Sequence, residues 1–295
     1  MSLNFIDISS WQKGLDLGAV FGKNASLDGV IVKSSGGSSY VQPTCDSWVQ
    51  WLISHNRPWG FYHYLDDDYK HSSGKVEAEF WVKTCKNYFG KGVPWADYEH
   101  PAKDKGTKYL REFLDTVYSL TGVKPGVYCS LSVVQSQDFK EIASAGYPLW
   151  VAQYANNNAV YGFQENPWQK GSVSPFDRYV MHQYTSCGYL NGFSGRLDFD
   201  KFYGSAGDWK ALAMGKEPEP LKPVKPVDSE IINKILDGVL GVEGERVRRL
   251  EELGYSPSEV QKKVNELYNA AQCCKRYLSG NLDYLDAIGK ILKSI

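Results

Sequence analysis

The stretch Val93-Pro-Trp-Ala-Asp-Tyr-Glu-His100 joins a short apolar run to two carboxylates. If the run is a strand, Asp97 and Glu99 stand two residues apart and point to the same side, because strand side chains alternate. Carboxylates at the carboxyl end of a barrel strand lie where such folds hold their chemistry. Two close like charges do not both ionise easily, so we expect Glu99 to keep its proton near neutral pH and act as a general acid. An exposed acidic pair at a strand end explains the spacing equally well.

Similar apolar runs lie on both sides of this stretch and alternate with amphipathic segments. This alternation predicts parallel strands covered by helices. The expected strands are residues 4–8, 29–33, 59–64, 93–98, 126–129, 149–153 and 178–183, and helices are expected at 45–55, 74–88 and 105–120. Beyond the sixth strand the helices fade, and strands follow one another across Gly, Asn and Ser turns. The pattern therefore predicts an α/β barrel of TIM type whose last third is mostly β.

A break in composition divides the chain. Proline alternates with charge in Lys216-Glu-Pro-Glu-Pro-Leu-Lys-Pro-Val-Lys-Pro226, which is typical of an extended spacer. We therefore expect a barrel over residues 1–213, a linker over 214–228 and a small all-helical module over 229–295. In the module, Ser256-Pro257-Ser258-Glu259 supplies an N-cap, a first-turn proline and a capping-box glutamate. A final amphipathic run at 282–292 and the small size of the module favour homo-oligomers formed through these helices.

Composition and local patterns exclude several classes of protein. Lys plus Arg total 33 against 34 for Asp plus Glu, so no broad positive field favours nucleic acid. No apolar run reaches about 18 residues, and no secretory pattern opens the sequence, so we expect cytoplasmic synthesis without membrane insertion, or secretion if an export signal has been removed. The 6 cysteines and 5 histidines lack ligand spacing. We expect reduced, packed cysteines and neither a metal nor a cofactor.

Further carboxylates end other predicted strands. Asp7 closes the first apolar run, and Asp198 and Asp200 stand two apart in the last one. The first and last strands of a closed barrel are neighbours, so Asp7 and Asp198 can converge on the Asp97 and Glu99 pair. Each of them alone is also explained as a helix cap or a turn residue.

Aromatic residues, 14% of the chain, gather near the same strand ends. They are Trp11, Tyr62, Tyr64, Trp95, Tyr98, Tyr128, Trp150, Tyr154 and Tyr184. Large rigid rings suit the apolar faces of sugars, and carboxylates beside them predict glycoside hydrolysis. Core packing is the alternative for any single ring.

An ordered set of motifs spans about residues 4–205. The motifs are Phe5-Ile-Asp-Ile-Ser9, Ile31-Val-Lys33, Gly60-Phe-Tyr-His-Tyr64, Asp97-Tyr-Glu99, Pro125-Gly-Val-Tyr128, Leu149-Trp-Val-Ala-Gln-Tyr154, Gln183-Tyr184 and Gly195-Arg-Leu-Asp198. In this order they resemble the glycoside hydrolase family 25 lysozymes. The resemblance implies a distorted (β/α) barrel and an endo-N-acetylmuramidase, which cuts the β-1,4 bond between N-acetylmuramic acid and N-acetylglucosamine in peptidoglycan.

Carried over by position, the resemblance implies roles for ten residues. Glu99 is the acid, and Asp97, Asp7 and Asp198 complete an acidic floor. Substrate contacts are implied for Tyr62, Tyr64, Tyr128, Trp150, Gln183 and Lys33. Two positions depart from the family: Lys33-Ser-Ser-Gly-Gly37 lacks the acidic residue common there, and Asp200 stands where Asn is frequent, which favours a structural role for Asp200.

The segment 235–265 resembles one copy of the three-helix cell-wall-binding repeat of some phage lysins. Leu240-Gly-Val-Glu243 replaces the usual Trp-Gly-Asn-Gly of such repeats. The resemblance implies that Arg246, Arg249 and Tyr255 contact a muropeptide, although a solvated helical face with ordinary ion pairs explains them equally well. The leading hypothesis is a phage endolysin, made in the host cytoplasm and acting on a Gram-positive wall after release, or a bacterial autolysin-type muramidase. Met214, just before the Pro-rich stretch 216–226, is a candidate internal start.

Two other functions remain open at this point. An acetamido-glycan hydrolase acting on a chitin-like substrate could use the same Asp-x-Glu chemistry. A barrel without catalysis could serve as a wall-binding lectin, because a fold does not fix a function. The complete acidic set favours an enzyme, and a wall-binding tail favours peptidoglycan over chitin.

Overall fold

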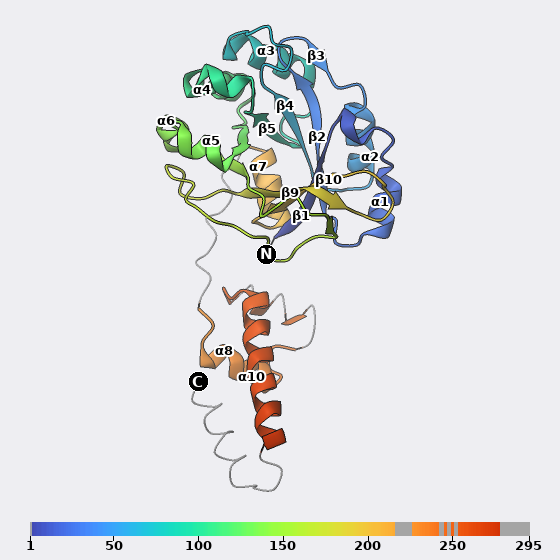
Figure 1. The fold of residues 1–295 in the computed structure, drawn as a ribbon, viewed down its shortest axis with the longest axis vertical. Coiled ribbons are helices and arrows are strands. Elements are labelled where there is room, and N and C mark those ends of the chain that lie inside the picture. Colours follow the sequence, from blue (N-terminus) through green and yellow to red (C-terminus); the bar gives the residue numbers. More distant parts are fainter. Residues whose placement is uncertain (1, 216–225, 242–244, 247–248, 251–252, 278–295) are drawn as a thin grey trace. The chain divides into compact units, whose positions relative to one another are not determined.

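The computed structural model describes residues 2–215, 226–241, 245–246, 249–250 and 253–277. The chain forms two compact units, Met1–Pro218 and Glu219–Ile295 (Figure 1). The larger unit holds the predicted strands, and the smaller unit is helical.

A closed barrel forms the first unit. Within the described residues, its eight strands follow the order β1-β10-β9-β7-β6-β5-β4-β2, and a β1–β2 pairing closes the ring. Their bounds are β1 Leu3–Ile8, β2 Gly29–Gly36, β4 Trp59–Tyr64, β5 Val93–Asp97, β6 Gly126–Ser130, β7 Leu149–Ala152, β9 Met181–Tyr189 and β10 Leu197–Phe202. Neighbouring strands are parallel except where β10 pairs with β1 and β9. Short strands β3 (Tyr40–Val41) and β8 (Val160–Tyr161) extend β2 and β9.

Helices cover the outside of the parallel part of the barrel (Figure 1). Their bounds are α1 Leu17–Lys23, α2 Cys45–Ser54, α3 Gly74–Cys85, α4 Thr107–Thr121, α5 Leu131–Ser136, α6 Lys140–Ser144 and α7 Ala206–Ala213, with 3-10 turns η1 (Ser10–Gln12) and η2 (Ala102–Lys105). Helix α4 buries Leu110, Phe113, Leu114 and Val117, the spacing of one helical face. It ends at Gly122, whose φ of 71° lies in the left-handed region that glycine adopts without strain.

Two apolar layers hold the barrel together. On β1, Phe5 faces the barrel interior while Ile6 packs against the outer helices, as the alternation of a strand requires. Trp209 of α7 joins the interior layer, and its indole N–H donates to the Trp59 carbonyl at 3.1 Å. Helix α7 therefore closes the end of the barrel where β4 begins.

The expected α/β barrel with a β-rich last third is confirmed, and some bounds differ. The strand predicted at 59–64 has those bounds, but the strand predicted at 178–183 is β9 and runs from Met181 to Tyr189. The strand predicted at 93–98 ends at Asp97. Cys45, Cys85, Cys129 and Cys187 are buried free thiols, as expected, whereas the side chains of Cys273 and Cys274 lie outside the described set.

The second unit packs helix α8 (Ser229–Leu236) with helix α10 (Pro257–Tyr277). Its core consists of Ile231, Ile232, Ile235, Leu240, Leu250 and Val260. Helix α10 begins at Pro257, where the capping pattern predicts a helix start. Among the described residues, no helix is both long and apolar enough to span a bilayer. The linker core 216–225 and the predicted helix 282–292 lie outside the described residues.

Candidate active site

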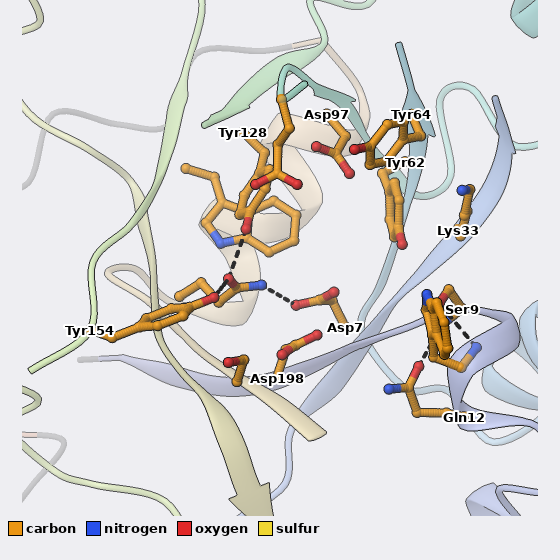
Figure 2. A pocket seen from close by; sticks show the side chains of 15 residues that line it. Asp7, Ser9, Gln12, Lys33, Tyr62, Tyr64, Asp97, Tyr128, Tyr154 and Asp198 are labelled. Atoms are coloured by element: carbon orange, nitrogen blue, oxygen red, sulfur yellow. Dashed lines mark hydrogen bonds between the residues drawn. The ribbon is translucent and has the colours of Figure 1, made fainter. Parts of the chain in front are cut away.

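A cleft of about 340 Å³ opens where the parallel strands of the barrel end. Its lining residues are Asp7, Ser9, Trp11, Gln12, Lys33, Tyr62, Tyr64, Asp97, Glu99, Tyr128, Trp150, Tyr154, Gln183, Ser186 and Asp198 (Figure 2). The set contains all ten residues for which the sequence implied a catalytic or substrate-binding role. The structure thus brings together side chains that are up to 191 positions apart in the chain, Asp7 and Asp198 among them.

Strand alternation explains why these side chains point inward. Asp7 continues the inward row that begins with Phe5 on β1, and Asp97 continues the row of Trp95 on β5. Gln183 follows Met181 on β9 in the same way. The inward rows are therefore apolar inside the barrel and become polar where the strands end.

A hydrogen-bonded chain fixes the cleft floor. The Gln183 amide donates to Asp7 Oδ2 at 2.7 Å, and its carbonyl oxygen accepts from the hydroxyls of Tyr128, at 2.8 Å, and Tyr154 (Figure 2). Because two hydroxyls donate to Gln183 Oε1, the amide cannot flip, and its N–H₂ group points toward the Asp7 carboxylate. The ring of Trp150 packs edge-on against Tyr128 at a centroid distance of 4.5 Å. Asp7 is thus held by a rigid support.

Asp7 and Asp198 face each other across the antiparallel β1–β10 register. Burial raises the pKa of Asp7 to about 6, although the hydrogen bond from Gln183 favours its charged form. Burial, followed by the charges of Asp7 and Glu99, raises the pKa of Asp198 to about 8. Both carboxyl groups therefore hold a proton more readily than an exposed aspartate does.

Strand β5 ends at Asp97, and Asp97 and Glu99 both line the cleft, as the predicted alternation requires. Tyr98 between them is buried in the outer apolar layer, and its amide donates to the Tyr128 carbonyl at 2.8 Å. Burial, followed by the charge of Glu99, raises the pKa of Asp97 well above its ordinary value. Burial also raises the pKa of half-buried Glu99. A proton held on Glu99 stays a prediction.

Lys33 occupies one edge of the cleft. Its ammonium group lies 2.9 Å from Asp67 Oδ2 and 4.7 Å from the ring centre of Tyr64. A Cβ at Gly36 would stand 2.4 Å from that Asp67 oxygen, so glycine is required for this approach. Asp67, on the loop after β4, thus places a carboxylate beside segment 33–37, which has none of its own.

Asp200 lies under the floor instead of lining the cleft. It is fully buried and accepts from the Trp150 indole N–H at 3.0 Å, and its carboxyl group lies near that of Asp7. Burial, together with the charges of Asp7 and Asp198, raises the pKa of Asp200 well above its ordinary value. A neutral Asp200 can donate its proton in a hydrogen bond to Asp7, which stabilises the Asp7 carboxylate.

Ser9, Gln12 and Ser186 line the cleft although the sequence singled out none of them. Ser9 and Gln12 form a capping box around η1, in which the Ser9 amide donates to Gln12 Oε1 at 2.9 Å. The Ser-x-x-Gln spacing of residues 9–12 is the sequence signal that could have located this turn. Among the described residues, no group of three or more His, Cys, Asp or Glu is arranged to hold a metal ion.

The three residues implied in wall binding lie in the second unit and contact groups there. Arg246 donates to the Gly241 carbonyl at 3.1 Å. Arg249 pairs with Glu245 at 2.7 Å, and the Tyr255 hydroxyl donates to Asp228 at 2.7 Å. These contacts order the small unit, and a role in binding the wall stays a prediction.

Comparison with known proteins assigns the barrel to a known family. A family model described as Glycosyl hydrolases family 25 matches residues 6–193. A protein named lysozyme from Streptococcus phage Cp-7 is 25% identical over 276 residues, which cover 89% of this chain and 69% of that protein. An autolytic lysozyme from Clostridium acetobutylicum is 26% identical over 204 residues, covering 67% of this chain and 55% of that protein.

A solved structure shares the barrel. The bacterial lysozyme from Streptomyces coelicolor superposes with a TM-score of 0.59 at 21% identity, and the match covers 72% of this chain and 97% of that chain. At this identity the likeness shows a common fold.

Proposed function

Since the chain belongs to the glycosyl hydrolases of family 25, the lysozyme or muramidase family, and is a hydrolase, we propose that it cuts the β-1,4 bond between N-acetylmuramic acid and N-acetylglucosamine in peptidoglycan. One observation carries the proposal. The carboxyl groups of Asp7, Asp97, Glu99 and Asp198 converge on a single cleft whose other walls are aromatic rings and fixed amides. Glycoside hydrolysis needs an acid, a second carboxyl group and a surface that holds sugar rings.

Glu99 serves as the acid in this proposal. It lies beyond the end of β5, so it is more accessible from the cleft than Asp97, while partial burial favours its protonated form. Its proton passes to the glycosidic oxygen as the C1–O bond breaks. Asp97 then stabilises positive charge at C1 or orients the substrate's N-acetyl group, and water completes the hydrolysis.

The remaining lining residues position the sugars. The phenols of Tyr62 and Tyr128 are buried, which raises the pKa of each well above its ordinary value, so both stay neutral hydrogen-bond donors. Tyr64 is partly exposed and offers a flat face for the apolar side of a sugar ring, whereas Trp150 is almost fully buried and supports Tyr128 from behind. Lys33 and Gln183 supply polar contacts at opposite sides of the acidic floor.

The second unit, residues 229–295 after the linker 214–228, serves in our proposal as the wall-binding domain. Support comes from the phage lysozyme, whose similarity covers 89% of this chain and so extends past the barrel. Arg246, Arg249 and Tyr255 provide the muropeptide contacts. The protein is then an endolysin that is made in the host cytoplasm, acts on a Gram-positive wall after release and associates through its C-terminal helices.

The nature of the new reducing end tests the proposed bond specificity. Purified Gram-positive peptidoglycan is digested and reduced with borohydride, which converts each new reducing sugar to its alditol. We expect muramitol. Glucosaminitol would show cleavage of the other glycosidic bond, and cleavage of chitin without cleavage of peptidoglycan would favour the alternative substrate.

A truncation tests the role of the tail. A chain ended after Ala213 keeps α7 and both apolar layers of the barrel. We expect it to release reducing ends from solubilised glycan at the rate of the full chain but to sediment less with intact walls. Equal sedimentation would contradict wall targeting by residues 229–295.

A further inference from the structure

Two aromatic side chains near the cleft are unusually exposed. Trp11 is 90% and Tyr161 is 81% exposed, the highest values among the large hydrophobic side chains of the described residues. Apolar rings in water are unfavourable, and exposed aromatic surface that continues from a site is typical of a binding surface. Neither ring contributes to a core layer.

Trp11 is held in a fixed position at the cleft. It lies in the turn η1, its amide donates to Ser9 Oγ at 3.3 Å, and the capping box orders both ends of the turn. The Gln12 side chain then donates to the Arg196 carbonyl at 3.4 Å, which attaches η1 to the loop before β10. The ring is therefore presented to solvent on a rigid base.

A chain of contacts leads from this turn to the second exposed ring. The antiparallel pairing of Leu197 with Gly188 sets the exposed Arg196 beside Tyr189 at the end of β9. The ring of Tyr189 stacks on that of Tyr161 at 5.4 Å with an interplanar angle of 24°. Strand pairing sets this stack, because Tyr161 on β8 is in register with Tyr189 on β9.

Strand β9 connects the stack to the cleft. It carries Gln183 and Ser186 in the cleft lining and Tyr189 at its end. Trp11, Arg196, Tyr189 and Tyr161 thus form one surface that begins at the cleft, which we name the aromatic strip. Its rings match the apolar faces of pyranose rings, and its one cation matches a carboxylate.

We propose that the aromatic strip is a secondary binding site for the distal part of a carboxylate-bearing glycan strand, with sugar rings on the aromatic side chains and a carboxylate on Arg196. The inference rests on the proposed function and deepens it. The cleft holds the bond to be cut, and the strip holds sugars further along the same strand. Long strands are then bound more tightly than short ones without any change at the acid.

Kinetics on two lengths of substrate test the strip in the full chain. The substrates are long solubilised glycan strands of peptidoglycan and a fragment of two disaccharide units. For Tyr161→Ala and for Arg196→Gln we expect KM on the long strands to rise about three- to tenfold, with kcat unchanged and with both constants unchanged on the fragment. Tyr161→Phe keeps the stacked ring and should restore the KM of the original chain.

A matched control is Tyr118→Ala, because Tyr118 is an exposed tyrosine of α4 outside the cleft lining and the strip. It should change neither constant. Unchanged KM on long strands in Tyr161→Ala and Arg196→Gln, or an equal rise on both substrates, would overturn the strip while leaving the proposed function intact. An unmodified chain that cuts neither substrate would overturn the proposed function, and the strip with it.

Discussion

Two clusters of acidic side chains in the barrel differ in the partners that surround them. The cleft cluster, Asp7, Asp97, Asp198 and Asp200, receives hydrogen bonds from the neutral groups of Gln183 and Trp150. Within the described residues, no ion pair links this cluster to Lys, Arg or His. The outer cluster, Asp66 and Glu77, lies beside the barrel wall and is surrounded by cations and donors.

Contacts in the outer cluster satisfy each carboxylate. Glu77 accepts from the Asp66 amide at 2.8 Å and the Tyr109 hydroxyl at 2.6 Å, and Lys105 lies 3.9 Å away. Asp66 accepts from the backbone and ring N–H groups of His71, both at 2.8 Å. A buried carboxylate with donors and a cation stabilises a fold, whereas one that lacks them keeps protons and remains available for chemistry. Partners, more than burial, separate the structural acids from the functional ones.

Removal of a cleft carboxylate should affect activity far more than stability. We expect Asp97→Asn to lower kcat by about 10²–10⁴-fold, because the second carboxyl group of the reaction is lost. The melting temperature should stay equal or rise, since Asp97 is buried with an unfavourable charge beside Glu99. Reducing-end assays and thermal melts check both. Activity within tenfold of the original chain would contradict the role of Asp97.

Removal of an outer-cluster carboxylate should affect stability far more than activity. Glu77→Ala leaves the buried Asp66 amide and the buried Tyr109 hydroxyl without their acceptor, so we expect the free energy of unfolding to fall by about 3–5 kcal/mol. Urea titration measures the change. Glu79→Ala, an exposed glutamate on the same helix, should cost no more than about 0.5 kcal/mol. Equal losses of unfolding free energy in Glu77→Ala and Glu79→Ala would contradict a structural role for the outer cluster.

Asp198 predicts how stability depends on pH. Its folded pKa of about 8 lies above the ordinary value, so the folded chain binds more protons, and the stability that Asp198 contributes is present in acid and lost as pH rises toward 8. Asn does not titrate. Between pH 5 and pH 8, we expect the free energy of unfolding of Asp198→Asn to rise by about 1–3 kcal/mol relative to that of the original chain. If the free energies of unfolding of the two proteins changed equally with pH, the raised pKa of Asp198 would be contradicted.

Asp200 should give the smallest effect on activity. An Asn side chain can still accept from Trp150 and donate to Asp7, so we expect Asp200→Asn to keep kcat within about threefold near pH 6. Asp200→Leu offers neither bond and should lose activity. A tenfold loss in Asp200→Asn would show that Asp200 acts as a charged group, and a pH profile of both variants distinguishes the cases.

Local pattern was enough to predict most of the barrel. The run Trp59–Tyr64 is apolar and bounded by turn residues, so its bounds could be predicted. Strand β9 was misplaced because its second half, residues 185–188, is small and polar and lacks the signal of a buried strand. The strand predicted at 93–98 ends one residue earlier, at Asp97, yet the alternation that the pattern predicts still places Asp97 and Glu99 in one cleft.

Those site residues that lie at the ends of predicted strands could be predicted from the sequence. Asp7 and Asp198 could be placed together because the first and last strands of a barrel are neighbours. Contacts between loops have no such periodic signal. The pairing of Lys33 with Asp67 and the support of Asp7 by Asp200 both depend on tertiary approach, so neither could be derived from the spacing of residues.

Glu99→Gln in the full chain tests the central claim, that the converging carboxylates hydrolyse a glycan through Glu99, most directly. The measurement is the rate of reducing-end release from purified Gram-positive peptidoglycan, with sedimentation on intact walls as the control for binding. We predict a rate about 10²–10⁴-fold lower with sedimentation unchanged, because glutamine keeps the shape of the side chain but has no proton to donate. A variant that cuts as fast as the original chain would contradict the account.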